Sequence, residues 1–156
     1  MNGDDLQCII ESNPCLRQKV KGVFSRTTLP VSVVQYPSVY IVNTDEDDGP
    51  GEHWVAIVLT NKGKGVFFDS FGRPPEFYGP ELTFFLKSNV DNYFHFKNQV
   101  QSKFSTRCGL FVLTFLMLYV CLQWPMDCIE KMFDVHLTVN DSIVIRIVNE
   151  YYEWCK

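Results

Sequence analysis

Three reactive side chains stand where elements of secondary structure are expected to begin or end. His53 precedes an apolar segment, Asp69 follows the next one, and Cys108 opens a long apolar stretch. A thiol at the start of a helix feels the positive end of the helix dipole, which lowers its pKa and favours the nucleophilic thiolate. A nearby histidine can take up the thiol proton, and a carboxylate can hold that histidine in one tautomer. The three residues predict nucleophilic chemistry, with Cys108 as nucleophile, His53 as base and Asp69 orienting the base.

Each of these residues alone has a plainer interpretation. A single cysteine on an apolar helix is most often a small buried hydrophobic residue, which is what we expect of Cys121 and Cys128. A single histidine is most often an ordinary polar residue, and we interpret His95 and His136 in this way. Only the joint pattern, a His-Trp strand, an aspartate at the end of the paired strand and a Cys-Gly helix start, favours a reactive site.

Two of the three residues should be positioned by a hairpin. Residues 53–60 are apolar on both faces, which predicts a central strand. Residues 61–65 read Asn-Lys-Gly-Lys-Gly and predict a tight turn, because glycine tolerates positive φ. Residues 66–69 then form the returning strand. This pairing would place His53 and Asp69 near the same edge of the sheet.

The remaining elements are expected to be short strands, loops and a series of helices. We predict strands over 39–42 and 93–97, an exposed loop over 44–51, a loop over 72–80, and mixed structure over 21–37. Helices are predicted over 4–12, 81–90, 107–122, 126–133 and 141–154. This order predicts an α+β fold, in which helices pack on a small mixed or antiparallel sheet. Cys108 would stand at the N-terminus of a central buried helix.

Length and charge restrict the function classes. The chain has 156 residues, which favours one domain over residues 1–156. Its 14 Lys+Arg stand against 18 Asp+Glu, giving a formal net charge of -4, so the composition offers no basic footprint for nucleic acid. The apolar stretch Gly109–Leu122 is too short to span a bilayer and fits a buried helix better.

The 6 cysteines are expected to be reduced thiols. Met1–Asp5 leads into mixed sequence rather than an apolar signal segment, so we expect a protein that is not secreted. The spacings Cys8/Cys15 and Cys121/Cys128 are too wide for zinc knuckles, and we predict no metal site.

Several short stretches resemble those of a known family. Gly51–Trp54, Phe68–Gly72 and Gln101 with Cys108–Phe111 are similar to the corresponding motifs of the adenovirus protease (adenain) family. Relatives of that family occur in adenovirus-like viruses and in Maverick/Polinton transposons, and the wider clan includes the Ulp-type proteases. The resemblance covers roughly residues 20–120, and it implies the adenain-like fold and a cysteine protease.

The resemblance also implies a role for each matching residue. His53 matches the general base, Asp69 the third member of the triad, which is glutamate in the adenoviral enzymes, and Cys108 the nucleophile. Gln101 matches the oxyanion-hole glutamine, and its spacing from Cys108 fits better than that of Gln99. The backbone N–H of Cys108 would be the second oxyanion donor.

Three further residues are expected near the substrate. In the family, the tryptophan that matches Trp54 helps to shape a narrow slot for small substrate residues. Gly51 belongs to the same motif, and Gly109 would let a substrate backbone approach closely.

The function implied is a cysteine endopeptidase that cuts viral or transposon precursor proteins, such as capsid or core components, at glycine-containing sites. Three alternatives remain open: a protease that removes SUMO- or NEDD8-type modifiers, an acetyltransferase of the same clan, and an inactive interaction module. The chain has little spare length for a modifier-binding surface, and its acidity argues against the basic sites that the acetyltransferases need. All four expected site residues are present, which argues against the inactive module.

Activation is expected to differ from that of the adenoviral enzymes, which use a disulfide-linked peptide and DNA. Residues 87–93, the corresponding stretch, contain no cysteine, and the chain is acidic. Nothing in the sequence therefore calls for a cofactor. The support that it gives for a peptide activator, or for nucleic acid as a partner, is weak. We expect a monomer without membrane contact that acts on polypeptides in the host nucleus or cytoplasm, packaged in virions in some cases.

Overall fold

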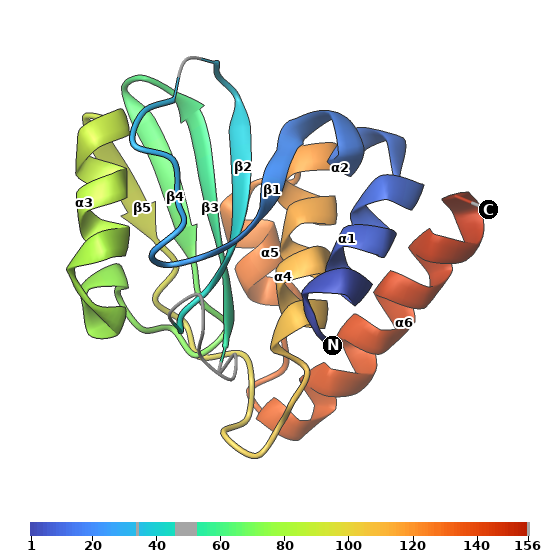
Figure 1. The fold of residues 1–156 in the computed structure, drawn as a ribbon. Helices are drawn as coiled ribbons and strands as arrows, with labels where there is room; N and C mark the ends of the chain where they lie inside the picture. Colours follow the sequence, from blue (N-terminus) through green and yellow to red (C-terminus); the bar gives the residue numbers. More distant parts are fainter. Residues whose placement is uncertain (34, 46–52, 156) are drawn as a thin grey trace.

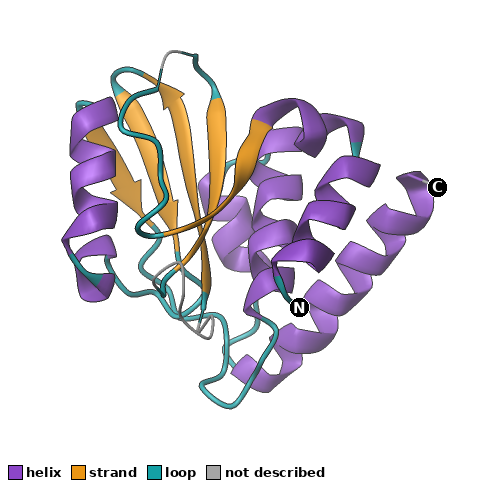
Figure 2. Cartoon of the chain, viewed as in Figure 1, coloured by secondary structure: helices purple, strands orange, loops and turns teal. Residues whose placement is uncertain are grey.

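The structure is a computed structural model that describes residues 1–33, 35–45 and 53–155, with side chains described through Tyr151. A single five-stranded sheet, formed by these residues, separates two helical layers (Figures 1 and 2). The helix α3 (Pro80–Asn89) covers one face, and all the other α-helices lie on the opposite face. The mixed α+β fold predicted from the sequence is confirmed.

The sheet is mixed, and its strands lie in the order in which they occur along the chain. Parallel pairs at both edges, β1–β2 and β4–β5, flank the antiparallel pairs β2–β3 and β3–β4. The central strand is β3, and its side chains from Trp54 to Leu59 are buried because helices cover both faces. The strands are β1 Val20–Ser25, β2 Ser38–Asn43, β3 Trp54–Asn61, β4 Lys64–Phe68 and β5 Asn92–His95.

The helix α4 lies between the sheet and α6, and it is the most deeply buried helix among the described residues (Figure 1). It begins at Cys108, and its side chains from Phe111 to Leu116 are buried on all sides. A π-helical turn, Met117–Cys121, continues it. The other helices are α1 Gly3–Ser12, α2 Pro14–Lys19, α5 Met126–Met132 and α6 Leu137–Cys155, with a 3-10 turn at Pro75–Tyr78.

Two cores follow from the alternation of side chains along β3. Ala56 and Val58 face α4, whereas Ile57 and Leu59 face α3. In the larger core, between the sheet and α4, the ring of Phe68 in β4 is stacked on that of Phe115 in α4, with centroids 4.3 Å apart. The smaller core packs Tyr40, Ile57, Phe67, Phe85 and Leu86 between the sheet and α3.

Two elements near the N-terminus are absent from the sequence prediction. The helix α2 has only 6 residues, and it begins where the Asn13 side chain accepts a hydrogen bond from the Leu16 N–H. The strand β1 lies at an edge and pairs in parallel with β2, so it depends on tertiary pairing more than on local propensity. At the other end of the chain, α6 begins at Leu137, before the predicted start at 141.

Two expectations about the cysteines are wrong. Cys15 of α2 and Cys121 of the π turn form a disulfide with Cα atoms 5.9 Å apart, so these two thiols are not reduced. Their separation of 106 residues explains why local spacing gave no sign of the pairing. Cys128 is exposed rather than buried, because α5 turns its neighbour Ile129 to the core instead.

Among the described residues, no helix combines the length and the apolar character needed to cross a membrane.

Candidate active site

The hairpin of β3 and β4 brings His53 and Asp69 together, as the turn sequence predicts. Ala56 pairs with Phe68, so His53 and Asp69 continue the two strands at the same edge of the sheet. Nε2 of His53 lies 2.6 Å from Oδ1 of Asp69. Both side chains are buried, with 6% of His53 and 0% of Asp69 exposed, so bulk water does not compete for this contact.

The Asp69 carboxylate is held by donors from the turn that follows β4. Oδ1 accepts from the backbone N–H of Phe71 at 3.0 Å, and Oδ2 accepts from that of Arg73 at 3.2 Å. The hydroxyl of Tyr78 donates to Oδ2 at 2.5 Å. Burial and the Asp69 charge raise the pKa of Tyr78, so the phenol keeps the proton that it donates. Asp69 therefore presents a fixed acceptor to His53.

Cys108 opens α4 and is partly exposed. Burial would raise the pKa of its thiol, but hydrogen bonding to His53 and backbone hydrogen bonds at Trp54 and Gly109 outweigh that effect. The pKa of Cys108 is therefore lowered from its ordinary value. A lowered thiol pKa is what nucleophilic attack near neutral pH requires.

His53 is shifted in the complementary direction. Burial alone would lower its pKa, but its contacts with Asp69 and Cys108 raise the pKa from 6.5 to about 9. Because Asp69 occupies Nε2, the ring nitrogen left for the thiol is Nδ1. The ring is also stacked on Phe71, with centroids 4.6 Å apart. The raised pKa of His53 and the lowered pKa of Cys108 thus shift the pair toward an imidazolium and a thiolate.

Gln101 lies at the same cavity as these residues. The cavity has a volume of about 300 Å³, and its lining includes His53, Trp54, Gln101 and Cys108. Gln101 is buried, and its amide contacts the hydroxyls of Ser70 and Ser105. The rival glutamine, Gln99, is exposed and donates to the backbone oxygen of Gln101 instead.

The three residues of the chain that were expected to lie near the substrate have different surroundings. Trp54 lines the cavity, and its indole N–H donates to the Met1 backbone oxygen at 3.2 Å. Gly109 is buried against Met1, and a Cβ added there would lie 2.8 Å from the Met1 sulfur. Gly51 lies outside the described residues.

Sequence reasoning missed several residues that shape the site. Tyr78 falls in a segment predicted only as loop, and Ser70 and Ser105 act through contacts across the fold that no local pattern reveals. Phe71 stands inside a motif that suggested the family, although its ring stacking was not predicted. A second cavity of about 530 Å³ shares His53 and Phe71 with the first, and Arg73 and Tyr78 contribute to its lining.

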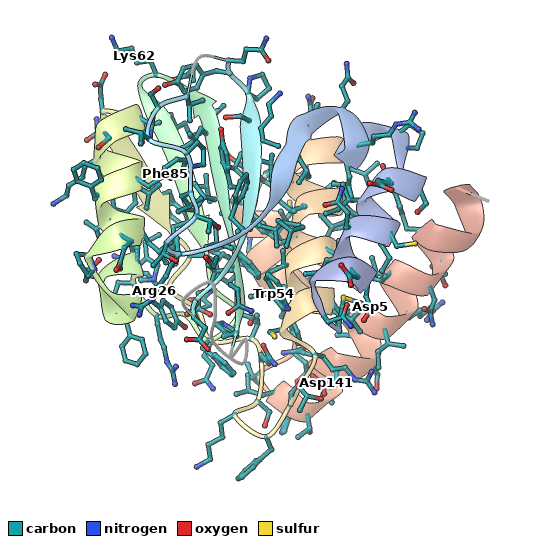
Figure 3. The ribbon with its side chains drawn as sticks, viewed as in Figure 1. Asp5, Arg26, Trp54, Lys62, Phe85 and Asp141 are labelled. Atoms are coloured by element: carbon teal, nitrogen blue, oxygen red, sulfur yellow. A yellow bond between two sulfur atoms is a disulfide. The ribbon has the colours of Figure 1, made fainter. Side chains whose placement is uncertain are left out.

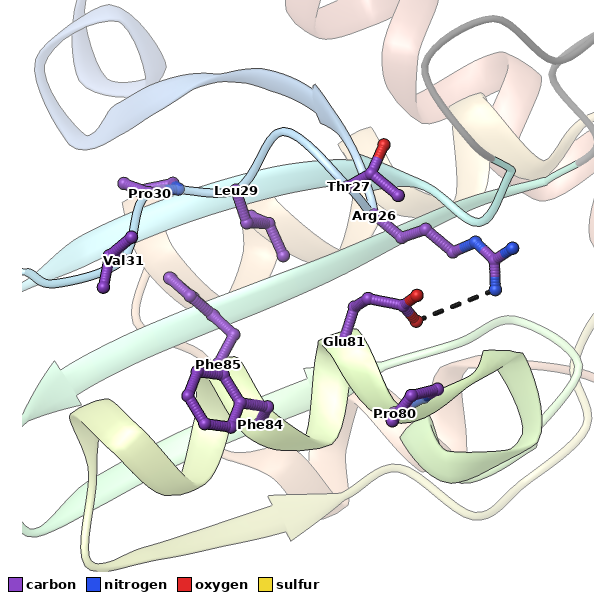
Figure 4. A pocket seen from close by; sticks show the side chains of 9 residues that line it. All are labelled: Arg26, Thr27, Leu29, Pro30, Val31, Pro80, Glu81, Phe84 and Phe85. Atoms are coloured by element: carbon purple, nitrogen blue, oxygen red, sulfur yellow. Dashed lines mark ion pairs between the residues drawn. The ribbon is translucent and has the colours of Figure 1, made fainter.

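A third cavity is separate from the candidate site. It has a volume of about 430 Å³ and lies between the segment from Arg26 to Val31 and α3 (Figure 4). Its lining is mostly apolar, with Phe84 and Phe85 on the helix side and an ion pair of 3.7 Å between Arg26 and Glu81. None of the predicted site residues lines it. Within the described parts of the chain, no group of three His, Cys, Asp or Glu side chains could hold a metal ion.

Comparison with known proteins identifies the family of this chain. A sequence model of the family described as adenovirus endoprotease matches residues 21–151 of the chain. No curated protein matches it. The family match spans most of the chain and includes His53, Asp69, Gln101 and Cys108. The chain therefore belongs to the adenovirus endoprotease family and is a cysteine endopeptidase.

Proposed function

We propose that this endopeptidase cuts viral or transposon precursor proteins, such as capsid or core components, at glycine-containing sites through a Cys108–His53–Asp69 triad. The main support for the triad is the buried contact of 2.6 Å between Nε2 of His53 and Oδ1 of Asp69, next to Cys108, whose pKa is lowered. The opposite pKa shifts of His53 and Cys108 favour a charged pair that is ready to react.

The reaction begins with attack of the Cys108 thiolate on the scissile carbonyl carbon. The carbonyl electrons move to oxygen, and the oxyanion is held by the Gln101 amide and the Cys108 backbone N–H. As the C–N bond breaks, the His53 imidazolium gives its proton to the leaving amine, and a thioester remains on Cys108. Neutral His53 then takes a proton from water, the hydroxide attacks the thioester, and the carboxylic product leaves as the thiolate re-forms.

Asp69 supports both half-reactions without giving up a proton of its own. It holds Nε2 of His53 and so leaves Nδ1 to exchange protons with the thiol and the leaving group. Its hydrogen bonds to the backbone at Phe71 and Arg73 and to Tyr78 keep the carboxylate from turning.

The size of the cavity supports small substrate residues near the cut bond. About 300 Å³ is at the lower end of the range for ligand pockets. The cavity is bounded by the bulky side chains of Met1, Trp54 and Phe71. Glycine leaves the substrate backbone free to enter such a space. The family match supports a polypeptide substrate.

A peptide-library digest tests this proposal. The wild-type protein should cut peptides with glycine on the acyl side of the cleaved bond, and Cys108→Ala should cut none. Cys128→Ala is the matched control, because Cys128 is also an unpaired cysteine and is exposed on another helix. Cleavage by Cys108→Ala, or an inactive wild-type protein, would contradict the proposal.

A second assay separates precursor cleavage from modifier removal. The protein is incubated with vinyl sulfones of ubiquitin, SUMO and NEDD8, and the labelled residue is identified by mass spectrometry. We expect Cys108 to stay unlabelled by these probes while it reacts with iodoacetamide. Rapid labelling of Cys108 by one of the modifiers would favour deconjugation instead.

A further inference from the structure

A chain of hydrogen bonds runs from the candidate site to the helix α6. The Ser70 hydroxyl donates to Oε1 of Gln101 at 2.5 Å. On the other side of the amide, Nε2 of Gln101 donates to the backbone oxygen of Ser105 at 3.0 Å and to its hydroxyl at 3.2 Å. The Ser105 hydroxyl in turn donates to Oδ1 of Asp141 at 2.8 Å. Asp141 stands on α6 close to the loop that leads into α4 (Figure 3).

The direction of this chain is set at Asp141. An ionised carboxylate only accepts hydrogen bonds, so the Ser105 hydroxyl must point its hydrogen at Asp141. The lone pairs of that hydroxyl are then left to accept from Nε2 of Gln101 and from the Arg107 N–H. The backbone oxygen of Ser105 also accepts only. Gln101 must therefore turn its NH₂ group to Ser105 and its oxygen to Ser70.

The same helix holds the segment on the other side of Gln101. Nδ2 of Asn140, the neighbour of Asp141, donates to the backbone oxygen of Val100 at 2.8 Å. Asn140 is completely buried, so this contact is sheltered from water. Two consecutive residues of α6 thus fix the segment that carries Gln101 before and after the amide.

The orientation of the amide decides whether Gln101 can stabilise an oxyanion. The two acceptors at Nε2 belong to one residue, so one three-centre hydrogen bond can serve both and leave the second hydrogen for the cavity. With the amide reversed, Oε1 would face the developing negative charge and repel it.

We infer that Asp141, acting through Ser105, is a positioning residue that holds the Gln101 amide as an oxyanion donor. This inference rests on the proposed function, in which Gln101 stabilises the oxyanion. The contribution of Asp141 arises only as the oxyanion forms, because it acts on a group that serves the transition state. Its loss should lower kcat and leave KM almost unchanged.

The test compares variants on one fluorogenic peptide amide with glycine on the acyl side of the cleaved bond. Asp141→Ala should lower kcat about tenfold, the equivalent of one lost hydrogen bond in the transition state. Asp141→Asn should stay close to the wild-type kcat, because its amide oxygen can still accept from Ser105. Ser142→Ala, an exposed neighbour on α6, is the matched control and should not change kcat.

Alkylation distinguishes positioning from damage to the fold. Iodoacetamide reacts with the Cys108 thiolate without forming an oxyanion, so Asp141→Ala should be alkylated at Cys108 at the wild-type rate. A slower reaction would mean that the substitution disturbs the nucleophile, and the inference would be wrong.

A double-mutant cycle with Gln101→Ala gives the deciding result. Gln101→Ala alone should lower kcat about 100-fold or more. In that background, Asp141→Ala should cause no further loss, because its effect passes through the missing amide. The inference would be overturned if the two losses of kcat multiplied in the double variant, or if Asp141→Ala alone kept the wild-type kcat. Either result would leave the proposed triad unaffected. A wild-type kcat for Gln101→Ala would instead refute the oxyanion role in the proposed function. Should Asp141→Ala not fold, Ser105→Ala must show the same coupling to Gln101.

Discussion

Asp69→Asn is the substitution with the clearest consequence for the candidate site. The carboxylate accepts from the Phe71 N–H at one oxygen and from the Arg73 N–H at the other. An asparagine must place its NH₂ group at one of these positions, and neither backbone N–H can turn away. Whichever way the amide is oriented, its NH₂ group faces the backbone N–H of Phe71 or of Arg73, and this buried N–H loses its acceptor. One unsatisfied buried donor costs about 1–3 kcal/mol of folding stability.

The effect on reactivity follows from the loss of charge at residue 69. Asp69 is the strongest of the contacts that raise the His53 pKa to about 9 against the effect of burial. Without the carboxylate, burial dominates and the imidazolium is disfavoured, so the Cys108 thiol loses the partner that lowers its pKa. A thiol with the ordinary pKa of 9.0 is less than about 1% thiolate at pH 6.5. The backbone hydrogen bonds at Trp54 and Gly109 remain. We therefore expect Cys108 alkylation at pH 6.5 to slow by about 10- to 100-fold.

The assay is iodoacetamide labelling at pH 6.5, with Cys108 followed by mass spectrometry of its peptide. Cys128 provides an internal reference, because it is exposed and its rate should not change. Asp91→Asn, at an exposed aspartate after α3, is the matched control for the substitution itself. A folded Asp69→Asn protein that labels at the wild-type rate would refute the argument that Asp69 stabilises the imidazolium.

Three further perturbations test other parts of the structure. The raised pKa of His53 stabilises the fold below pH 6.5 and that contribution is lost as the pH rises through about 9, whereas the lowered pKa of Cys108 stabilises it above pH 9.0 and that contribution is lost as the pH falls. Above pH 6.5 the two effects on stability have opposite signs, so urea unfolding should depend less on pH for wild type than for Cys108→Ala, in which the Asp69 contact with His53 remains. Tyr78→Phe removes a donor to a buried carboxylate and should lower the free energy of unfolding by about 1.5–3 kcal/mol in urea titrations, and an unchanged value would contradict the hydrogen bond. Gly72→Ala should destabilise by more than about 1 kcal/mol, because φ is +72° and the added Cβ would lie 2.6 Å from the backbone oxygen of Lys97, which follows β5. Gly63→Ala, in an exposed turn, is its control and should be tolerated in the same titration.

The parts of the fold that depend on local sequence could be predicted. The sequence at 61–65 predicts the β3–β4 hairpin, whose turn in the structure is residues 62–63, and this hairpin brings His53 and Asp69 together. The apolar run after Cys108 likewise predicts a buried helix that starts at the thiol. In these cases neighbouring residues carry the whole signal.

The remaining features depend on contacts between distant parts of the chain. The pairing of β1 with β2 and the Cys15–Cys121 disulfide are contacts between separate elements, and no local pattern encodes them. The same holds for the donors around the site, since Ser70 meets Gln101 and Ser105 meets Asp141 across the fold. Hydropathy patterns say nothing about such pairs, because a polar residue in a loop gives no indication of its partner.

The division of the site between two layers has a mechanical consequence. His53 directly precedes β3 and Asp69 directly follows β4, whereas Cys108 is the first residue of α4. The distance between the His53 ring and the Cys108 thiol, which a proton must cross, therefore depends on the spacing between the sheet and α4. That spacing is set by the core side chains between them, and the stacked rings of Phe68 and Phe115 are among these. These apolar rings take no part in the reaction, yet they help to set the distance between His53 and Cys108.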